Sequence, residues 1–194
     1  SSHHHHPVDS PGASCVGCHM PQSLYMVIDE RADHSMRVPR PDLSLELGTP
    51  NACSHCHKDK PVQWAVDTVN DWYGNIRGDA TPFAHAIHAG RSDAPDAGEQ
   101  LMALAVDPEQ PAIARATALD LLHEHAQPNH RLSLPRLLGD PDPLVRGAAV
   151  RYLEAMDADV LYRFGMPTLE DPVRTVRLDA ARVLAPLLRY ELPP

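Results

Sequence analysis

The sequence predicts a mainly α-helical protein, in which an irregular N-terminal module precedes a short α-solenoid of stacked helix pairs. Three observations support this prediction. Prolines interrupt the first third of the chain, and each one restricts its own backbone and that of the residue before it. From residue 80 onward the chain becomes rich in Ala, Leu and Arg. An internal repeat in this second part places Arg115, Arg146 and Arg177 at intervals of 31 residues.

Residues 1–12 carry four consecutive histidines close to the N-terminal end. On the local sequence alone, such a run is typical of a purification tag. The functional alternative is that one of His3, His4 and His6 binds a metal ion. The run itself leaves both origins open.

Residues 13–61 contain all four cysteines of the chain, in two copies of a C-x-x-C-H motif, 15–19 and 53–57. This spacing is the signature of c-type haem attachment. Two thiols form thioethers with the two vinyl groups of one porphyrin, and the His that follows binds the iron as its proximal ligand. The motifs therefore predict two covalent haem c groups. The predicted thioether residues are Cys15, Cys18, Cys53 and Cys56, and the predicted proximal ligands are His19 and His57.

Two alternatives to haem exist for the four thiols. A single zinc ion could be bound by four thiolates, since the spacing of the pairs is near that of zinc ribbons. The pairs could also form two disulfides. Neither alternative requires a His directly after each second Cys, so haem attachment is the favoured interpretation.

A low-spin haem needs a second axial ligand opposite the proximal His. His34 lies in an expected loop, 15 residues after His19, and we expect it to be a distal ligand. Asp33 beside it is expected to influence the tautomer of this imidazole, as carboxylates near metal-binding histidines do. Met26 and Met36 are competing candidates, although Met in a loop more often serves packing.

Residues 62–74 predict a helix, because Pro61 suits its first helical position and Gly74 suits its end. Trp64 in this helix could pack on the second porphyrin or against the next helix. Earlier in the chain, the apolar run 24–28 is either a short strand or the wall of a haem pocket.

The change in composition predicts a dihaem cytochrome module in residues 1–74 and a helical repeat domain in residues 75–194. An Asp-Pro pair precedes each copy of the repeat, and we expect the Asp to cap the helix start and the Pro to fill its first turn. Because one helix pair cannot bury its apolar face alone, the pairs are expected to stack. The expected helices lie near residues 82–90, 97–105, 110–126, 132–138, 142–156, 158–168 and 172–188. His85 and His88 share one face of the first helix, and either is a weaker candidate for an iron ligand.

The formal net charge of −9 excludes two classes of partner. Nucleic acid and anionic lipid both demand basic patches, so we expect neither as a partner. No apolar run approaches the ~20 residues of a membrane span. Haem is attached to C-x-x-C-H motifs outside the cytoplasm. We therefore expect a periplasmic or extracellular protein, whose export signal was removed or lies upstream.

Several segments resemble one family of multihaem c-type cytochromes. These segments are residues 12–21, 25–29, 33–44, 48–57 and 64–65. The family is distantly similar to the tetrahaem cytochromes of ammonia oxidation and to pentahaem nitrite reductase, and has a C-terminal helical repeat region of the HEAT or tetratricopeptide kind. The resemblance implies a mainly α fold, with an irregular haem-organised module followed by a short α-solenoid of HEAT-like helix pairs.

The resemblance also implies three properties of the ligands and the chain. His34 matches the Asp-His-Ser motif of the family, which fits a distal ligand. Relatives carry a His-rich segment before Ser-Pro-Gly, so His3, His4 and His6 are implied to be native, with one of them a distal ligand. Relatives are longer and carry more C-x-x-C-H motifs upstream, so this chain resembles the C-terminal part of a larger cytochrome.

The favoured function is electron transfer through two bis-His, low-spin haems, with a repeat domain that docks a redox partner protein or further haem domains, or forms a homo-oligomer. One alternative is an enzyme that reduces nitrite, hydroxylamine or a similar small molecule at a haem with an open sixth position. Arg31, Arg37 and Tyr25 are available for such a site. Another alternative is a redox- or gas-sensing interaction module. Fold and cofactor alone do not decide between these functions.

Overall fold

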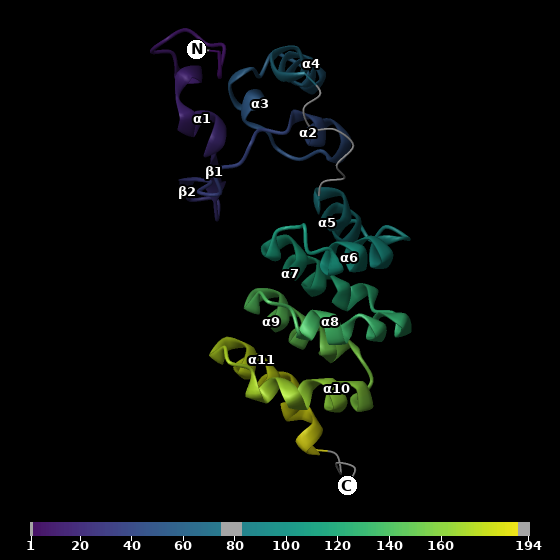
Figure 1. Ribbon diagram of the computed structural model, residues 1–194. Helices are drawn as coiled ribbons and strands as arrows, with labels where there is room; N and C mark the ends of the chain where they lie inside the picture. Colours follow the sequence, from purple (N-terminus) through teal and green to yellow (C-terminus); the bar gives the residue numbers. More distant parts are fainter. Residues whose placement is uncertain (1, 75–82, 190–194) are drawn as a thin grey trace. The chain divides into compact units, whose positions relative to one another are not determined.

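The computed structural model describes residues 2–74 and 83–189, and the chain divides into two compact units, Ser1–Ala80 and Thr81–Pro194 (Figure 1). The protein is mainly α-helical, as the sequence predicts. The described residues contain one sheet, a two-stranded antiparallel hairpin. The domain boundary predicted after residue 74 borders residues 75–82, which lie outside the described residues.

The first unit consists of short helices and the hairpin (Figure 1). In chain order its elements are η1 (Pro11–Ala13), α1 (Cys15–His19), β1 (Gln22–Tyr25), β2 (Asp29–Ala32), α2 (Pro41–Leu47), α3 (Ala52–Cys56) and α4 (Val62–Tyr73). Helix α1 contacts α3, and both α2 and α3 pack against α4. Helix α4 therefore supports the segment that carries the second C-x-x-C-H motif.

Proline and glycine set the ends of two helices in this unit. The helix predicted over residues 62–74 is confirmed as α4, with Pro61 as its N-cap and Gly74, at φ 66°, after its last residue. Prolines in residues 13–61 were expected only to interrupt helices, but Pro41 begins α2. The first turn of a helix needs no donor from its N–H groups, so Pro is accepted there. Gly48 ends α2 in the left-handed conformation, at φ 70°.

The apolar run 24–28 forms the end of β1 and the turn that leads to β2. Leu24 and Tyr25 pair with Glu30 and Asp29 on the opposite strand. The turn residues Met26 and Val27 have positive φ values of 51° and 67°. All five side chains of the run are exposed.

The second unit contains a counterpart for each of the seven predicted helices, although residue 82 at the start of the first lies outside the described residues. Several α-helices continue as 3-10 turns, which shortens the α-helical part relative to the prediction. The elements are α5 (Phe83–Arg91), α6 (Ala97–Val106), α7 (Ala112–Leu121), η2 (Leu122–His125), η3 (Pro128–Leu132), α8 (Leu134–Leu138), α9 (Pro143–Tyr152), η4 (Leu153–Ala155), α10 (Ala158–Gly165), η5 (Met166–Glu170), α11 (Arg174–Leu184) and η6 (Ala185–Arg189).

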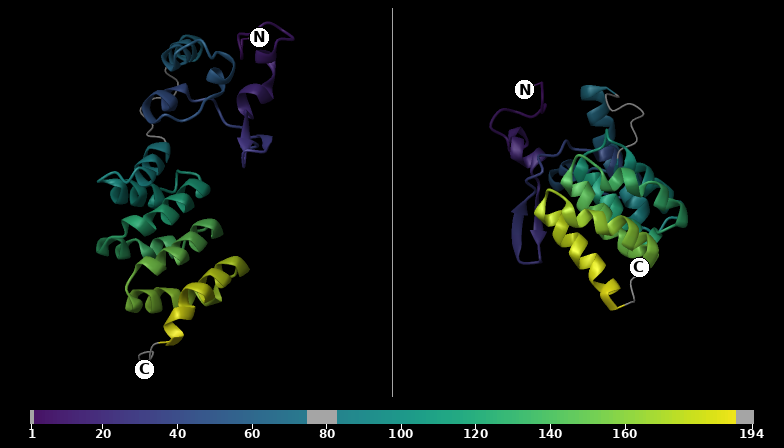
Figure 2. Two further views of the ribbon diagram at one scale, coloured as in Figure 1. Left: turned by 180° about the vertical axis from the view of Figure 1, so that it is seen from behind. Right: turned by 60° about the horizontal axis from the view of Figure 1, so that its bottom comes forward.

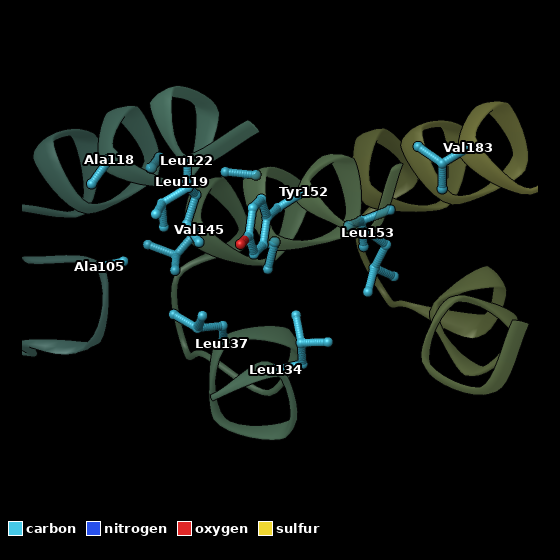
Figure 3. Close-up of a cluster of buried hydrophobic side chains, with 14 of the residues drawn as sticks. Ala105, Ala118, Leu119, Leu122, Leu134, Leu137, Val145, Tyr152, Leu153 and Val183 are labelled. Atoms are coloured by element: carbon cyan, nitrogen blue, oxygen red, sulfur yellow. The ribbon is translucent and has the colours of Figure 1, made fainter. Parts of the chain in front are cut away.

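Helices of successive repeats lie side by side in this second unit (Figure 2). Helix α7 packs against α6 on one side and α9 on the other, and α9 packs in turn against α11. Leu, Ala and Val side chains fill the spaces between them, together with the fully buried Tyr152 (Figure 3). Burying one Leu or Val side chain stabilises the fold by roughly 1.5–3 kcal/mol, so this stacking is the main source of stability of the unit.

The Asp of the Asp-Pro pairs does not cap the helices directly, contrary to the prediction. Asp140 accepts the N–H of Asp142 at 2.9 Å, and Asp171 accepts that of Val173 at 2.8 Å. Asp142 caps α9 by accepting the N–H of Leu144. An Asp side chain readily accepts the N–H two residues later, so each Asp-Pro pair makes a turn that precedes the helix.

The recurring arginines connect neighbouring repeats. The Arg115 guanidinium donates to the carboxylate of Asp140, which lies 25 residues later, and both side chains are buried. Arg146 repeats this bond with Asp171, at 2.7 and 3.0 Å from the two carboxylate oxygens. Because the partner belongs to the next Asp-Pro turn, the 31-residue spacing records a structural link.

A buried histidine gives the second unit an expected pH dependence. His130 is buried and its Nδ1 lies 2.7 Å from the Tyr152 hydroxyl. Burial lowers the pKa of His130 and raises the pKa of Tyr152 to about 12. The unfolded chain therefore binds a proton at this His that the folded chain refuses, so stability should fall as the pH drops below about 6.5.

This expectation can be checked by urea denaturation at a series of pH values. The free energy of unfolding should decrease between about pH 7 and the lowered pKa of His130. His130→Gln should flatten the profile in that range, whereas the exposed control His88→Gln should keep the wild-type profile. Equal profiles for the wild type and His130→Gln would exclude His130 as the titrating group.

Candidate haem-binding site

Each C-x-x-C-H motif folds into a short helix with its His at the C-terminal end. The first motif is α1 itself, and in the second His57 is the C-cap of α3. Asn51 fixes the start of α3, because its side chain accepts the Ser54 N–H at 3.0 Å and donates to Ser44 Oγ at 2.9 Å. Both Asn51 and Ser44 are buried. The second motif is therefore firmly anchored to α2.

The contact between α1 and α3 brings thiols of the two motifs near one another. All four cysteines are free thiols. Burial raises the pKa of Cys18, and the nearby thiols of Cys56 and Cys15 raise it further. Burial likewise raises the pKa of Cys53, with Cys18 as the next cause. These thiols therefore stay protonated at neutral pH, whereas zinc binds thiolates.

The zinc alternative finds no further support in the geometry. Across residues 2–74 and 83–189, no group of three or more His, Cys, Asp or Glu side chains is arranged to hold a metal ion. The thiols are placed in two pairs on two helices, which is the arrangement that two separate thioether-linked groups require.

His19 is oriented by a backbone hydrogen bond. Its Nδ1–H donates to the carbonyl oxygen of Arg37 at 2.8 Å, across 18 residues of chain. This bond fixes the tautomer and leaves the lone pair on Nε2, as in most metal-binding histidines. The His3 ring lies opposite, with 5.9 Å between the two ring centres and 15° between their planes.

His57 has a corresponding imidazole partner. The ring centre of His6 lies 6.1 Å from that of His57, with 35° between the planes. Two imidazoles that bind one metal ion from opposite sides, each through a nitrogen about 2 Å from the metal, place their ring centres about 6 Å apart. Trp64 packs against the other part of this site, with its ring centre 4.7 Å from that of His57.

His6 is the best oriented of the three candidate ligands in the N-terminal histidine run. Its Nδ1–H donates to the carbonyl oxygen of His4, which leaves Nε2 as the free ring nitrogen. The N–H of His6 in turn donates to Nδ1 of His4 at 3.2 Å, so His4 has the opposite tautomer and its Nε2 carries the proton. The hydrogen bonds therefore favour His6 over His4 as a ligand.

Gly12 leaves the space in which the His6 ring lies. A Cβ atom at this position would be 2.3 Å from Cδ2 and 2.7 Å from Nε2 of His6, far inside van der Waals contact. The sequence carried a signal for this role in the Ser-Pro-Gly segment before the first motif. The sequence pattern alone did not show which His needs that space.

The histidine run packs on the C-terminal end of α4, 70 residues away in the chain. The His5 ring stacks on Trp72 with 4.4 Å between ring centres, and the Tyr73 hydroxyl donates to the carbonyl oxygen of His3. A run that makes specific contacts with a distant helix supports a native origin over a purification tag.

His34 is exposed and follows β2 directly. Its Nδ1–H donates to the carbonyl oxygen of Ala32 at 2.8 Å, so this carbonyl sets its tautomer. Asp33 was expected to have that role, but its carboxylate accepts the N–H of Ser35 instead. Within the described residues no ring contact joins His34 to a second imidazole. The assignment of His34 to one of the two irons stays a prediction.

The remaining candidates are placed as follows. His85 and His88 lie on α5 in the second unit, and their prediction as ligands is untested. The three side chains available for an enzymatic site are exposed. The Arg31 guanidinium lies over the Tyr25 ring, 4.5 Å from its centre, and Arg37 Nε donates to Ser35 Oγ.

Comparison of the chain with family models, curated proteins and solved structures finds no match. None of the helices in the described part of the chain combines the length and apolar character needed to cross a membrane.

Proposed function

We propose that the protein is a dihaem c-type cytochrome segment that transfers electrons, as its resemblance to the C-terminal part of multihaem cytochromes implies. The observation that carries this proposal is the pairing of imidazoles. His19 faces His3 and His57 faces His6, each at about the separation expected of two ligands to one metal ion. Each pair includes the His that directly follows a pair of thiols.

The residues fit two covalently attached haem groups. Cys15 and Cys18 would hold one porphyrin, and Cys53 and Cys56 the other. A haem iron with two imidazole ligands takes up and releases one electron at a lower potential than one with His and Met. The Arg37 carbonyl orients His19, Gly12 leaves room for His6, and Trp64 covers His57.

The packing of α1 on α3 favours transfer between the two centres. Cys18 from the first motif lies near enough to Cys56 and Cys53 of the second for their ionisations to interact. Groups attached to these thiols are held as neighbours. Closed coordination at both irons favours electron transfer over reduction of a small molecule, which needs an open position.

The second unit forms, in this proposal, a short α-solenoid of HEAT-like helix pairs that docks a redox partner protein or further haem domains. Exposed apolar side chains support a docking role. Ile113 and Leu144 occupy equivalent positions in successive repeats, and both are exposed. Attachment of haem places the protein in the periplasm or outside the cell.

The test is maturation of the chain in a host that attaches haem c, followed by mass spectrometry and spectroscopy. We expect the polypeptide mass plus two haem groups, low-spin spectra, and no spectral shift with carbon monoxide. The double variant Cys53→Ser/Cys56→Ser should keep one haem. A colourless protein that contains one zinc ion would refute the proposal in favour of the thiolate alternative.

A further inference from the structure

We propose that His34 is an axial ligand for a third haem, carried by polypeptide outside residues 1–194 and with an open axial position. The inference rests on the proposed function and begins with a count of imidazoles. His3 and His19 form one pair and His6 and His57 another, so both resident irons have two ligands without His34. An oriented imidazole is left over.

His34 has the properties of a ligand that awaits a metal. Its Nδ1–H is bound to the Ala32 carbonyl oxygen, so the lone pair lies on Nε2. The side chain is exposed, so a metal can approach. The neighbouring carboxylate of Asp33 is occupied by Ser35 at 2.9 Å and lies 3.8 Å from Arg37 Nε. The hydrogen bonds of His19 and His34 are alike, since each donates Nδ1–H to a backbone carbonyl at 2.8 Å.

The surface around His34 suits a porphyrin rather than a hydrated metal ion. Apolar side chains flank it in the chain on both sides, and all of them are exposed, up to 89% for Val27. They are Leu24, Met26, Val27, Ile28, Met36 and Val38. The hairpin that carries the first four extends about 10 Å from Ala32 to Asp29, at about 3.3 Å per residue. This length is comparable with the width of a porphyrin ring.

The backbone of this surface is strained. Met26, Val27 and Met36 have φ values of 51°, 67° and 49°, in the left-handed region that favours glycine. Strained conformations of non-glycine residues concentrate at ligand-binding sites. Here the strain holds apolar side chains on either side of the oriented imidazole.

A second copy of this chain cannot supply the open iron. Its two haem irons would be closed by the same histidine pairs, so neither has a free position for His34. The occupant is therefore a c-type haem attached to other polypeptide and ligated on one side only. This would place His34 at a junction between haem groups along an electron-transfer path.

The test uses the matured dihaem chain and a short haem c peptide with one C-x-x-C-H motif and an open axial position. Addition of the wild-type chain should convert the high-spin peptide haem to low-spin, as followed by absorption and electron paramagnetic resonance. His34→Ala should abolish this conversion and leave both resident haems low-spin. The control His88→Ala removes another exposed imidazole and should retain the conversion.

Two results would overturn the inference while the proposed function stands. The first is a resident haem that becomes high-spin in His34→Ala, since His34 would then serve that iron. The second is conversion of the peptide haem that does not depend on His34. Absence of covalent haem from the matured wild-type chain would instead refute the proposed function, and the inference with it.

Discussion

Replacement of His6 by alanine is expected to turn one of the two haems from low-spin to high-spin and to leave the other unchanged. His6 is the imidazole opposite His57, and its Nε2 is the nitrogen left free by the bond from Nδ1–H to the His4 carbonyl. Loss of this ligand opens one axial position. Electron paramagnetic resonance should show one high-spin and one low-spin centre, and carbon monoxide should bind to half of the haem.

Gly12→Val should cause the same change without removing any ligand. The new side chain would occupy the place of the His6 ring, whose Cδ2 lies 2.3 Å from the position of a Cβ atom. Gly17→Ala is the matched control, because its Cβ would meet only the Pro11 carbonyl oxygen and Ser14 Cβ, at 3.6 and 3.9 Å. An unchanged spectrum in His6→Ala would remove His6 from the ligand set.

The proximal half of the candidate site was predictable from the sequence, and the distal half was not. Cys15–His19 encodes its chemistry in five consecutive residues, so spacing alone identifies it. The partner of His57 comes from a run of four histidines whose rings differ only in their contacts. Those contacts join residues up to 70 positions apart, and no local pattern in the sequence records them.

Expectations about local structure failed where a residue has two uses. Pro41 was expected to break a helix but begins one, because the same missing N–H that disrupts a helix interior is harmless in its first turn. Asp140 was expected to cap a helix but turns the chain before it and binds Arg115. The repeat was visible as a spacing, but its purpose became clear only from the contact between adjacent repeats.

That contact predicts the largest effect on stability. Arg146→Met should lower the free energy of unfolding by about 3–5 kcal/mol, the usual cost of leaving one partner of a buried ion pair alone. Arg146 and Asp171 are 12% and 8% exposed, and the guanidinium also donates to the Asp140 carbonyl oxygen at 2.9 Å. The control Arg182→Met breaks the exposed bond to Glu154 and should cost less than about 1 kcal/mol.

The pH dependence of the same variant separates the ion pair from simple loss of packing. The hydrogen bond from Arg146 lowers the pKa of Asp171, so the folded state holds this carboxylate ionised more strongly than the unfolded chain does. The resulting stability is present above about pH 4, the ordinary pKa of Asp, and is lost as the pH falls through the lowered pKa. In urea denaturation, Arg146→Met should therefore differ most from the wild type near neutral pH and approach it in acid. A difference that stays constant with pH would show that Arg146 acts through its aliphatic packing and not through its charge.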